Sequence, residues 1–260
     1  MRQDLTHAHR AGALSLDLMP VSLKDHVILV VGASSGIGRA TAMMMARDGA
    51  KVMASARRQD RLEDLQREMA AEGIAMEIVA ADATDVSAMN RLVEATRQKL
   101  GPVDIVVYAT GTNTPDRSTQ RLRPEIWNEL ITTNLNGAYY ITQAVLPAMR
   151  EARNGHLIYV SSISGHTPDV SGAAYQATKR GLIGLSHAIR VEEKQNGIRT
   201  TVINPGMVDT ELMEKRPVKP TAEMLAQALL PEHVAEAILM CAKLPSRAVI
   251  PELTIVGSAL

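Results

Sequence analysis

The sequence lacks several features that would point to particular classes of protein: it has one cysteine, no phenylalanine, one tryptophan and no net charge. Its single cysteine, Cys241, cannot form an internal disulfide, and no neighbouring Cys or His has the spacing of metal ligands. With 28 basic and 28 acidic residues, the chain has no electrostatic basis for nucleic acid or an anionic membrane as its main partner. We therefore expect a cytoplasmic protein that binds a small molecule and no metal.

The N-terminal residues MRQDLTHAHRAGALSLDLMP combine two arginines with an apolar stretch, as a secretory signal peptide does. Asp17 interrupts that stretch, which is too short for a secretory core, and no small-residue cleavage pattern follows. We expect residues 1–20 to be a flexible N-terminal extension and residues 21–260 to form one domain, which is large enough to bury a full core.

From His26 onward, short β-branched runs alternate with longer amphipathic stretches, a pattern typical of a mostly parallel sheet with helices on both faces. The short runs predict strands at 27–31, 51–55, 75–80, 105–108, 156–161, 199–203 and 248–251. The amphipathic stretches predict helices at 36–48, 61–72, 86–100, 124–150, 172–195 and 231–244. The sequence therefore predicts an α/β fold of the doubly wound, Rossmann type with a seven-stranded sheet.

One interior segment, residues 213–222, contains Pro217 and Pro220 among basic side chains and follows the sixth predicted strand. Because ligands of such sheets bind beyond the carboxyl ends of the strands, we expect the region around 207–225 to form a lid over the substrate. A plain surface loop is the alternative.

The first predicted strand leads directly into a glycine-rich turn, GASSGIG at Gly32–Gly38, and then into a helix. Glycines allow a tight turn and close backbone approach, while the helix N-terminus offers free N–H groups to a pyrophosphate. This context predicts a dinucleotide site. The alternative is a strand-to-helix turn with a purely structural role.

Tyr175 and Lys179 are four residues apart, which places the phenol and the ammonium on one face of a helix. A nearby cation favours the phenolate and lowers the phenol's pKa toward the range useful for acid–base catalysis. Ser161 and Ser162 end the preceding strand, where the two elements can converge. An exposed helix face is the alternative for the Tyr–Lys pair alone.

Together these residues resemble the single-domain short-chain dehydrogenase/reductases, over a region from Val21 to about Leu253. The family's motifs occur in its order at Gly32–Gly38, Asp82, Asn134, Ser162, Tyr175 with Lys179, and Asn204-Pro205-Gly206. The resemblance implies that Tyr175 is the general acid or base, and that Lys179 holds the nicotinamide ribose and lowers the pKa of Tyr175. It also implies that Ser162 polarises the substrate oxygen and that Asn134 anchors a water linking Lys179 to solvent.

The predicted cofactor-binding set follows from the same resemblance and from the glycine-rich turn. It comprises Gly32, Ser34, Ser35, Gly36, Ile37, Gly38, Arg57, Arg58, Asp82, Ala83, Ala109, Gly111, Tyr175, Lys179, Pro205, Gly206, Val208 and Thr210. One motif departs from the family: Tyr108-Ala109-Thr110-Gly111 stands where Asn-Asn-Ala-Gly is usual, so both asparagine side chains are absent.

The end of the second predicted strand bears on the choice of nicotinamide cofactor. Ala56 stands where an acidic residue would bind the ribose hydroxyls of NAD, and Arg57 and Arg58 follow it. Guanidinium groups suit phosphate, so Arg57, with help from Arg58 and Ser35, is expected to favour NADP. The alternative is that Arg57, Arg58 and Arg61 form an ordinary solvated helix start.

Three functions are compatible with these residues. The first is an NADP-dependent oxidoreductase acting on a small carbonyl or secondary alcohol such as a sugar, polyol or keto compound. The second is a 3-oxoacyl-carrier-protein reductase, with Arg117, Arg121 and Arg123 as a surface patch for an acidic carrier. The third, a non-catalytic NADP-binding scaffold, conflicts with the presence of all the catalytic residue types.

Substrate contacts are expected from the loops around 113–119, 164–171 and 207–223, and His166 is either a substrate contact or a solvated loop residue. The family resemblance also implies a homo-oligomer, dimer or tetramer, formed through the long helices predicted at 124–150 and 172–195.

Overall fold

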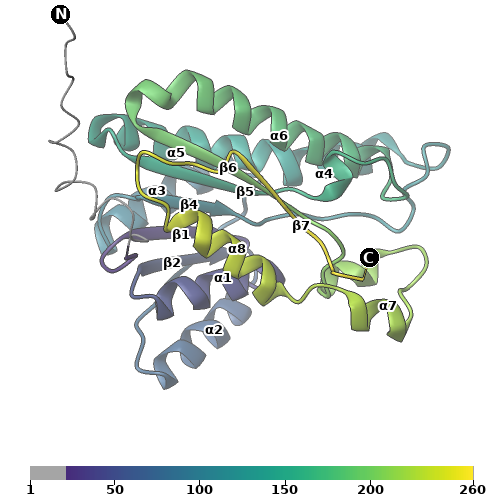
Figure 1. Ribbon diagram of the computed structural model, residues 1–260, viewed down its shortest axis with the longest axis horizontal. Coiled ribbons are helices and arrows are strands. Elements are labelled where there is room, and N and C mark those ends of the chain that lie inside the picture. The colour runs from purple at the N-terminus through teal and green to yellow at the C-terminus, as the bar shows by residue number, and fades with distance from the viewer. Residues whose placement is uncertain (1–21, 260) are drawn as a thin grey trace, which may run out of the picture.

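The computed structural model describes residues 22–259, so the extension expected at residues 1–20 lies outside the described residues. One parallel sheet of seven strands has the order β3-β2-β1-β4-β5-β6-β7 (Figure 1). The strands are β1 (Val27–Val31), β2 (Lys51–Ala56), β3 (Glu77–Ala80), β4 (Ile105–Tyr108), β5 (Gly155–Val160), β6 (Ile198–Pro205) and β7 (Glu252–Ile255). The helices are α1 (Gly36–Arg47), α2 (Gln59–Ala71), α3 (Val86–Lys99), α4 (Pro124–Ile131), α5 (Gly137–Ala152), α6 (Ala173–Glu193), α7 (Ala222–Gln227) and α8 (Pro231–Ala242). The predicted doubly wound Rossmann fold is confirmed.

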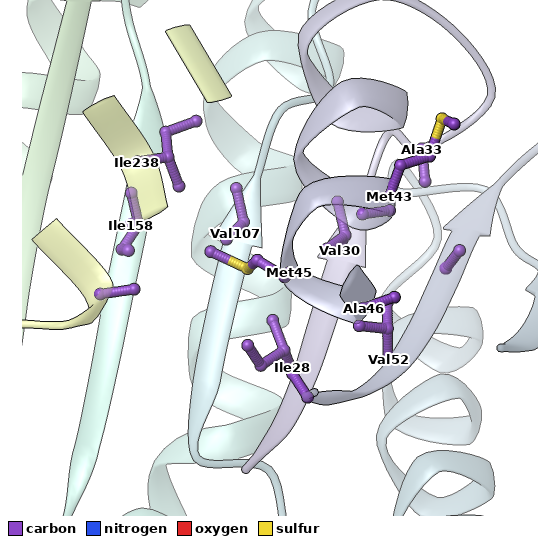
Figure 2. Packing of buried hydrophobic residues seen from close by; sticks show 14 of the residues in the cluster. Ile28, Val30, Ala33, Met43, Met45, Ala46, Val52, Val107, Ile158 and Ile238 are labelled. Atoms are coloured by element: carbon purple, nitrogen blue, oxygen red, sulfur yellow. The ribbon is translucent and has the colours of Figure 1, made fainter. Parts of the chain in front are cut away.

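Helices cover both faces of the sheet. In Figure 1, α1, α2 and α8 lie on one side, and α3, α4, α5 and α6 lie on the other. Strand β1 is buried along its whole length, as its unbroken VILVV run requires. Ile28 and Val30 pack toward α1 beside Met45 (Figure 2), whereas Leu29 and Val31 belong to the core under α3 and α5. The alternation of side chains along the strand thus supplies both cores.

The last strand lies further along the chain than the sequence predicts. A strand at 248–251 is wrong, because β7 begins at Glu252, directly after Pro251. Proline has no backbone N–H to give to a sheet, and Pro251 contributes only its carbonyl, which accepts from the N–H of Val202 at 2.9 Å. Regular pairing with β6 starts one residue later, at Val202 opposite Glu252.

The stretch predicted as one helix at 124–150 is divided. A π-helical turn at Thr132–Asn136 separates α4 from α5, and such turns are frequent at functional sites. After β6, the sequence patterns also miss a short 3-10 helix at Glu211–Lys215, which lies within the region expected to be a lid, and α7, which begins in that region and ends beyond it. Figure 1 shows α7 apart from the two helical layers.

The parallel arrangement determines where a ligand can bind. All the strands end at the same edge of the sheet, and the chain leaves β1 toward β2 on one side and β4 toward β5 on the other. This change of direction between the neighbouring strands β1 and β4 is the switch point at which open α/β sheets bind ligands. Within residues 22–259, no helix combines the length and apolar character needed to cross a membrane.

Candidate active site

A cleft of about 400 Å³ lies at the carboxyl edge of the sheet. Its walls come from the turn after β1, the ends of β2 to β6, and the first turns of α1 and α6. Every site residue predicted from the sequence lines this cleft except Gly38 and Asn134, which lie directly behind its wall. The structure therefore brings together residues that are up to 178 positions apart, from Gly32 to Thr210.

The glycine-rich turn has no room for side chains. Gly32 has a φ of +99°, and a Cβ there would lie 2.7 Å from the backbone nitrogen of Thr110. A Cβ on Gly38 would lie 2.2 Å from the carbonyl oxygen of Gly32, so the first turn of α1 packs directly on the loop. The Ser35 side chain does not cap α1, and the first turn contains no acidic residue. The backbone N–H groups in the first turn of α1 can therefore bind phosphate, as a dinucleotide site requires.

Asn134 is fully buried in the π-helical turn and holds the segment after β4. Its Oδ1 accepts from the N–H of Thr112 at 2.7 Å, and its Nδ2 donates to the Thr112 carbonyl at 2.9 Å and to the Thr178 hydroxyl at 3.1 Å. The amide thus links the β4 loop to α6. Its expected role of anchoring a water stays a prediction.

Lys179 is buried on α6, one turn after Tyr175, and its Nζ lies 5.5 Å from the centre of the Tyr175 ring. The ammonium donates to the carbonyl of Val160 at 2.9 Å, while the hydroxyl of Ser161 donates to the Lys179 carbonyl at 2.8 Å. These two bonds join the end of β5 to α6, which brings the neighbouring Ser162 into the same cleft.

The electrostatics of Tyr175 differ from the sequence-based expectation. Burial raises its pKa to about 12, and the hydroxyl of Ser162 together with the charges of Arg117 and Arg216 only partly opposes this. Burial also lowers the pKa of Lys179 to about 8. The expectation that Lys179 brings the phenol's pKa below its usual value is therefore not met by these residues, because desolvation of the phenol outweighs the favourable charges.

At the other end of the cleft, β2 finishes at Ala56 and offers no carboxylate. Arg58 donates to the hydroxyls of Ser34 at 3.0 Å and Ser35 at 2.8 Å, and also to the carboxylate of Glu211 at 2.9 Å. Arg57 lines the same wall. The sequence reasoning missed Glu211, because it lies 153 residues from Arg58 and no local pattern connects the two.

Arg117 is not where the carrier-protein hypothesis requires it. It is only 9% exposed, and its guanidinium donates to the carbonyls of Thr114 at 2.9 Å and Lys215 at 2.6 Å. Arg121 forms an exposed ion pair with Asp116. A surface patch of Arg117, Arg121 and Arg123 is therefore wrong, since its first member points inward. Lys215 is a further cleft residue that was not singled out from the sequence.

His166 does not line the cleft. Its Nε2 lies 2.7 Å from the carboxylate of Glu252, which His187 also approaches at 2.8 Å. Of the two interpretations of this residue, the structure favours the one without a substrate contact. Among residues 22–259, no group of three His, Cys, Asp or Glu side chains is arranged to hold a metal ion.

The fold and this cleft together define a class, the Rossmann-type α/β proteins with a ligand cleft at the carboxyl edge of the sheet. The sequence matches the short chain dehydrogenase family over residues 26–220, and the chain belongs to that family.

Three known proteins illustrate the relationship. An uncharacterized oxidoreductase of Staphylococcus saprophyticus is 34% identical over 223 residues, covering 84% of this chain and 89% of the relative. The closed form of a serine dehydrogenase complexed with NADP+ has a TM-score of 0.81 and 32% identity, covering 88% of this chain and 94% of that one. An alcohol dehydrogenase from the archaeon Thermococcus sibiricus, complexed with 5-hydroxy-NADP, has a TM-score of 0.80 and 28% identity, covering 90% of this chain and 97% of that one.

Proposed function

We propose that this protein is an NADP-dependent dehydrogenase or reductase that interconverts a small secondary alcohol and its carbonyl compound, with Tyr175 as general acid and base. The observation that carries the proposal is the convergence of Ser162, Tyr175 and Lys179 in the same cleft as the glycine-rich turn. The complexes of the serine dehydrogenase and the archaeal alcohol dehydrogenase with NADP and 5-hydroxy-NADP support the choice of cofactor.

The residues fit a dinucleotide. A cradle without Cβ atoms at Gly32 and Gly38, and an uncapped α1 N-terminus, would hold the pyrophosphate. When bound, the nicotinamide supplies or accepts the hydride. During oxidation, Tyr175 takes the hydroxyl proton of the alcohol as the C–H bond gives up its hydride and the C=O bond forms; during reduction it returns that proton. Ser162 holds the reacting oxygen in the position that favours this transfer.

The preference for NADP over NAD rests on the end of β2. Ala56 places no carboxylate at the end of β2, where one would repel a 2′-phosphate, and Arg57 and Arg58 offer guanidinium groups on the cleft wall. The carboxylate of Glu211 on the same wall is paired with Arg58. Purified enzyme should therefore show a higher kcat/KM with NADPH than with NADH. A higher value with NADH would overturn the cofactor assignment and leave the reaction class in place.

The function is tested with a panel of carbonyl compounds and alcohols, each run with both cofactors in both redox states, while the absorbance of the reduced nicotinamide is followed. Turnover that disappears in Tyr175→Phe is the expected result. A scaffold without catalysis would bind NADPH and turn over none of the panel. The cytoplasmic location, the homo-oligomer and the lid around 207–225 stay predictions from the sequence.

A further inference from the structure

Three cations gather at the Tyr175 end of the cleft. Arg117 comes from the segment after β4, and Lys215 and Arg216 come from the segment after β6. Lys215 lines the cleft wall together with Ser162 and Tyr175. Arg117 and Arg216 are near enough to Tyr175 for their charges to act on its phenol, although burial dominates the pKa of that group.

Arg117 is rigidly placed behind this wall. A Cβ on Gly172, whose φ is +91°, would lie 2.7 Å from the Cβ of Arg117, so the arginine stem packs against the chain three residues before Tyr175. Among residues 22–259, its guanidinium donates to two backbone carbonyls, those of Thr114 and Lys215, and to no side chain. The charge is thus buried among neutral acceptors, and burial together with the charge of Arg216 lowers the pKa of Arg117. A negative charge close to Arg117 would therefore stabilise its charged form.

These three cations have no carboxylate as an ion-pair partner within the described residues. Among residues 22–259, none forms an ion pair with Arg117, Lys215 or Arg216, whereas the exposed Arg58 and Arg121 each have one. The acid that acts on Arg117 from a distance, Asp169, accepts instead from the Ser164 hydroxyl and the Ser171 N–H. Of the three, only Arg117 is buried, whereas Arg216 is half-buried and Lys215 is exposed. A buried charge without a partner is costly, so an anionic group of a ligand beside Arg117 would stabilise it.

The Lys215 ammonium is the cation that a ligand can reach. Lys215 is exposed, and its ammonium donates to the Thr112 hydroxyl at 2.6 Å, a neutral acceptor. Among residues 22–259, no carboxylate forms an ion pair with it, so none competes with a ligand anion. Thr112 is fixed on both backbone groups by Asn134, and the adjoining Gly111 approaches Lys179 so closely that a Cβ there would lie 3.4 Å from Nζ. Lys215 is therefore held beside the catalytic group rather than at the Arg58 end.

We propose that the substrate carries a carboxylate as well as the reacting hydroxyl or carbonyl group, and that Lys215, backed by Arg117 and Arg216, binds this carboxylate. The substrate class is thus a short hydroxy acid and the corresponding oxo acid. Leu212 and Met213, which line the same cleft, provide apolar surface for its carbon chain. This inference rests on the proposed function, because the position of the substrate carboxylate is defined relative to a reacting group held by Ser162 and Tyr175.

The test compares acids with their neutral counterparts. Steady-state oxidation with NADP+ is measured for 2- and 3-hydroxy acids of four or five carbons, for 4-hydroxypentanoate, and for the methyl esters of all of these. We expect kcat/KM for the preferred acid to exceed that for its ester by about tenfold or more, the value of one charge-assisted hydrogen bond. Butyrate, which has the acid without the hydroxyl, is expected to inhibit competitively against that substrate.

Lys215→Met should remove the preference by raising KM for the acid about tenfold, with little change for the ester. Lys194→Met, which removes an exposed lysine at the end of α6, is the matched control and should change neither substrate. If the cations served only to tune Tyr175, Lys215→Met and Arg117→Gln would shift the pH profiles of acid and ester equally, and the inference would be wrong.

The outcomes separate the two proposals. Equal use of acid and ester by the unaltered enzyme, or equal slowing of both in Lys215→Met, overturns the carboxylate site and leaves the proposed oxidoreductase standing. If no acid, ester, neutral alcohol or carbonyl compound is turned over with either cofactor, the proposed function fails, and the carboxylate site fails with it.

Discussion

The two ends of the cleft each have an arginine, Arg58 and Arg117, and these two arginines lie in opposite environments. At the Arg58 end, the arginine side chain is 43% exposed and paired with Glu211, which is 46% exposed. At the Tyr175 end, Arg117 is 9% exposed and, within the described residues 22–259, its guanidinium bonds to backbone carbonyls alone. An exposed ion pair contributes at most about 1 kcal/mol and can change partners readily. A buried, unpaired cation is far less tolerant, so we expect the Tyr175 end to determine the chemistry and the Arg58 end to adjust affinity.

The largest expected effect comes from removing the phenol hydroxyl at the buried end. Tyr175→Phe should lower kcat by about a hundredfold to ten-thousandfold, the contribution of a positioned general acid or base. NADPH binding, measured by quenching of protein fluorescence, should change little because the ring remains. Tyr139→Phe, on an exposed ring of α5, is the matched control. Full turnover in Tyr175→Phe would remove the mechanism proposed above.

The pH dependence of turnover reports how strongly burial acts on Tyr175. Burial raises the pKa of Tyr175 to about 12, so at neutral pH the phenolate needed as a base in oxidation is scarce. Each unit of rising pH increases the phenolate fraction by up to about tenfold, so kcat/KM for oxidation should rise with pH. The kcat/KM for reduction should not rise, because reduction needs the protonated phenol. Steady-state profiles in both directions measure this. An oxidation profile that levels off below pH 8 would mean that the pKa is lowered in the working enzyme.

Local patterns predicted the parts of the site that are close in sequence or follow strand ends. The alternation of strand and helix patterns predicts the fold, and the glycine spacing after the first strand predicts the turn. Helix geometry places Tyr175 and Lys179 on one face. The exact start of β7 could not be derived in the same way, because Pro251 contributes a carbonyl to the sheet while lacking an N–H, a contact that only the folded chain defines.

The residues that sequence reasoning missed are those brought in by long-range packing. Glu211 reaches Arg58 across 153 positions, and Lys215 reaches Thr112 across 103. The burial of Arg117 could not be predicted either. A lone arginine in a polar loop is predicted to be solvent-exposed, and only the folded chain shows that it packs against Gly172. The raised pKa of Tyr175 has the same origin, since burial is a property of the whole fold.

At the exposed end, replacing both Arg57 and Arg58 by alanine should lower kcat/KM with NADPH by about tenfold to a hundredfold. This range corresponds to losing charge-assisted hydrogen bonds to a phosphate. With NADH, which has no 2′-phosphate, the change should stay within about threefold, so the ratio of the two values reports the effect. Arg67→Ala, on an exposed arginine of α2 paired with Asp64, is the control. Equal losses with both cofactors would assign these arginines a structural role instead.

The smallest effect is expected at the carboxylate that pairs with Arg58. Glu211→Gln removes a negative charge that a 2′-phosphate would otherwise meet, and it frees Arg58 from its partner at 2.9 Å. NADPH should therefore bind up to about fivefold more tightly and NADH equally well, because exposed pairs contribute only about 0 to 1 kcal/mol. Fluorescence titration at low and high salt measures both, and the gain should shrink as salt screens the charges.

Glu214→Gln, in the same 3-10 helix but without an ion pair among residues 22–259, is the matched control for this small effect. A gain shared by both glutamine variants would reflect net charge alone. If Glu211→Gln instead weakened NADPH binding, the carboxylate would be holding Arg58 in place for the phosphate. Arg58 would then be held in a fixed position, as the backbone carbonyls of Thr114 and Lys215 hold Arg117, and the two arginines would differ in solvent exposure and not in rigidity.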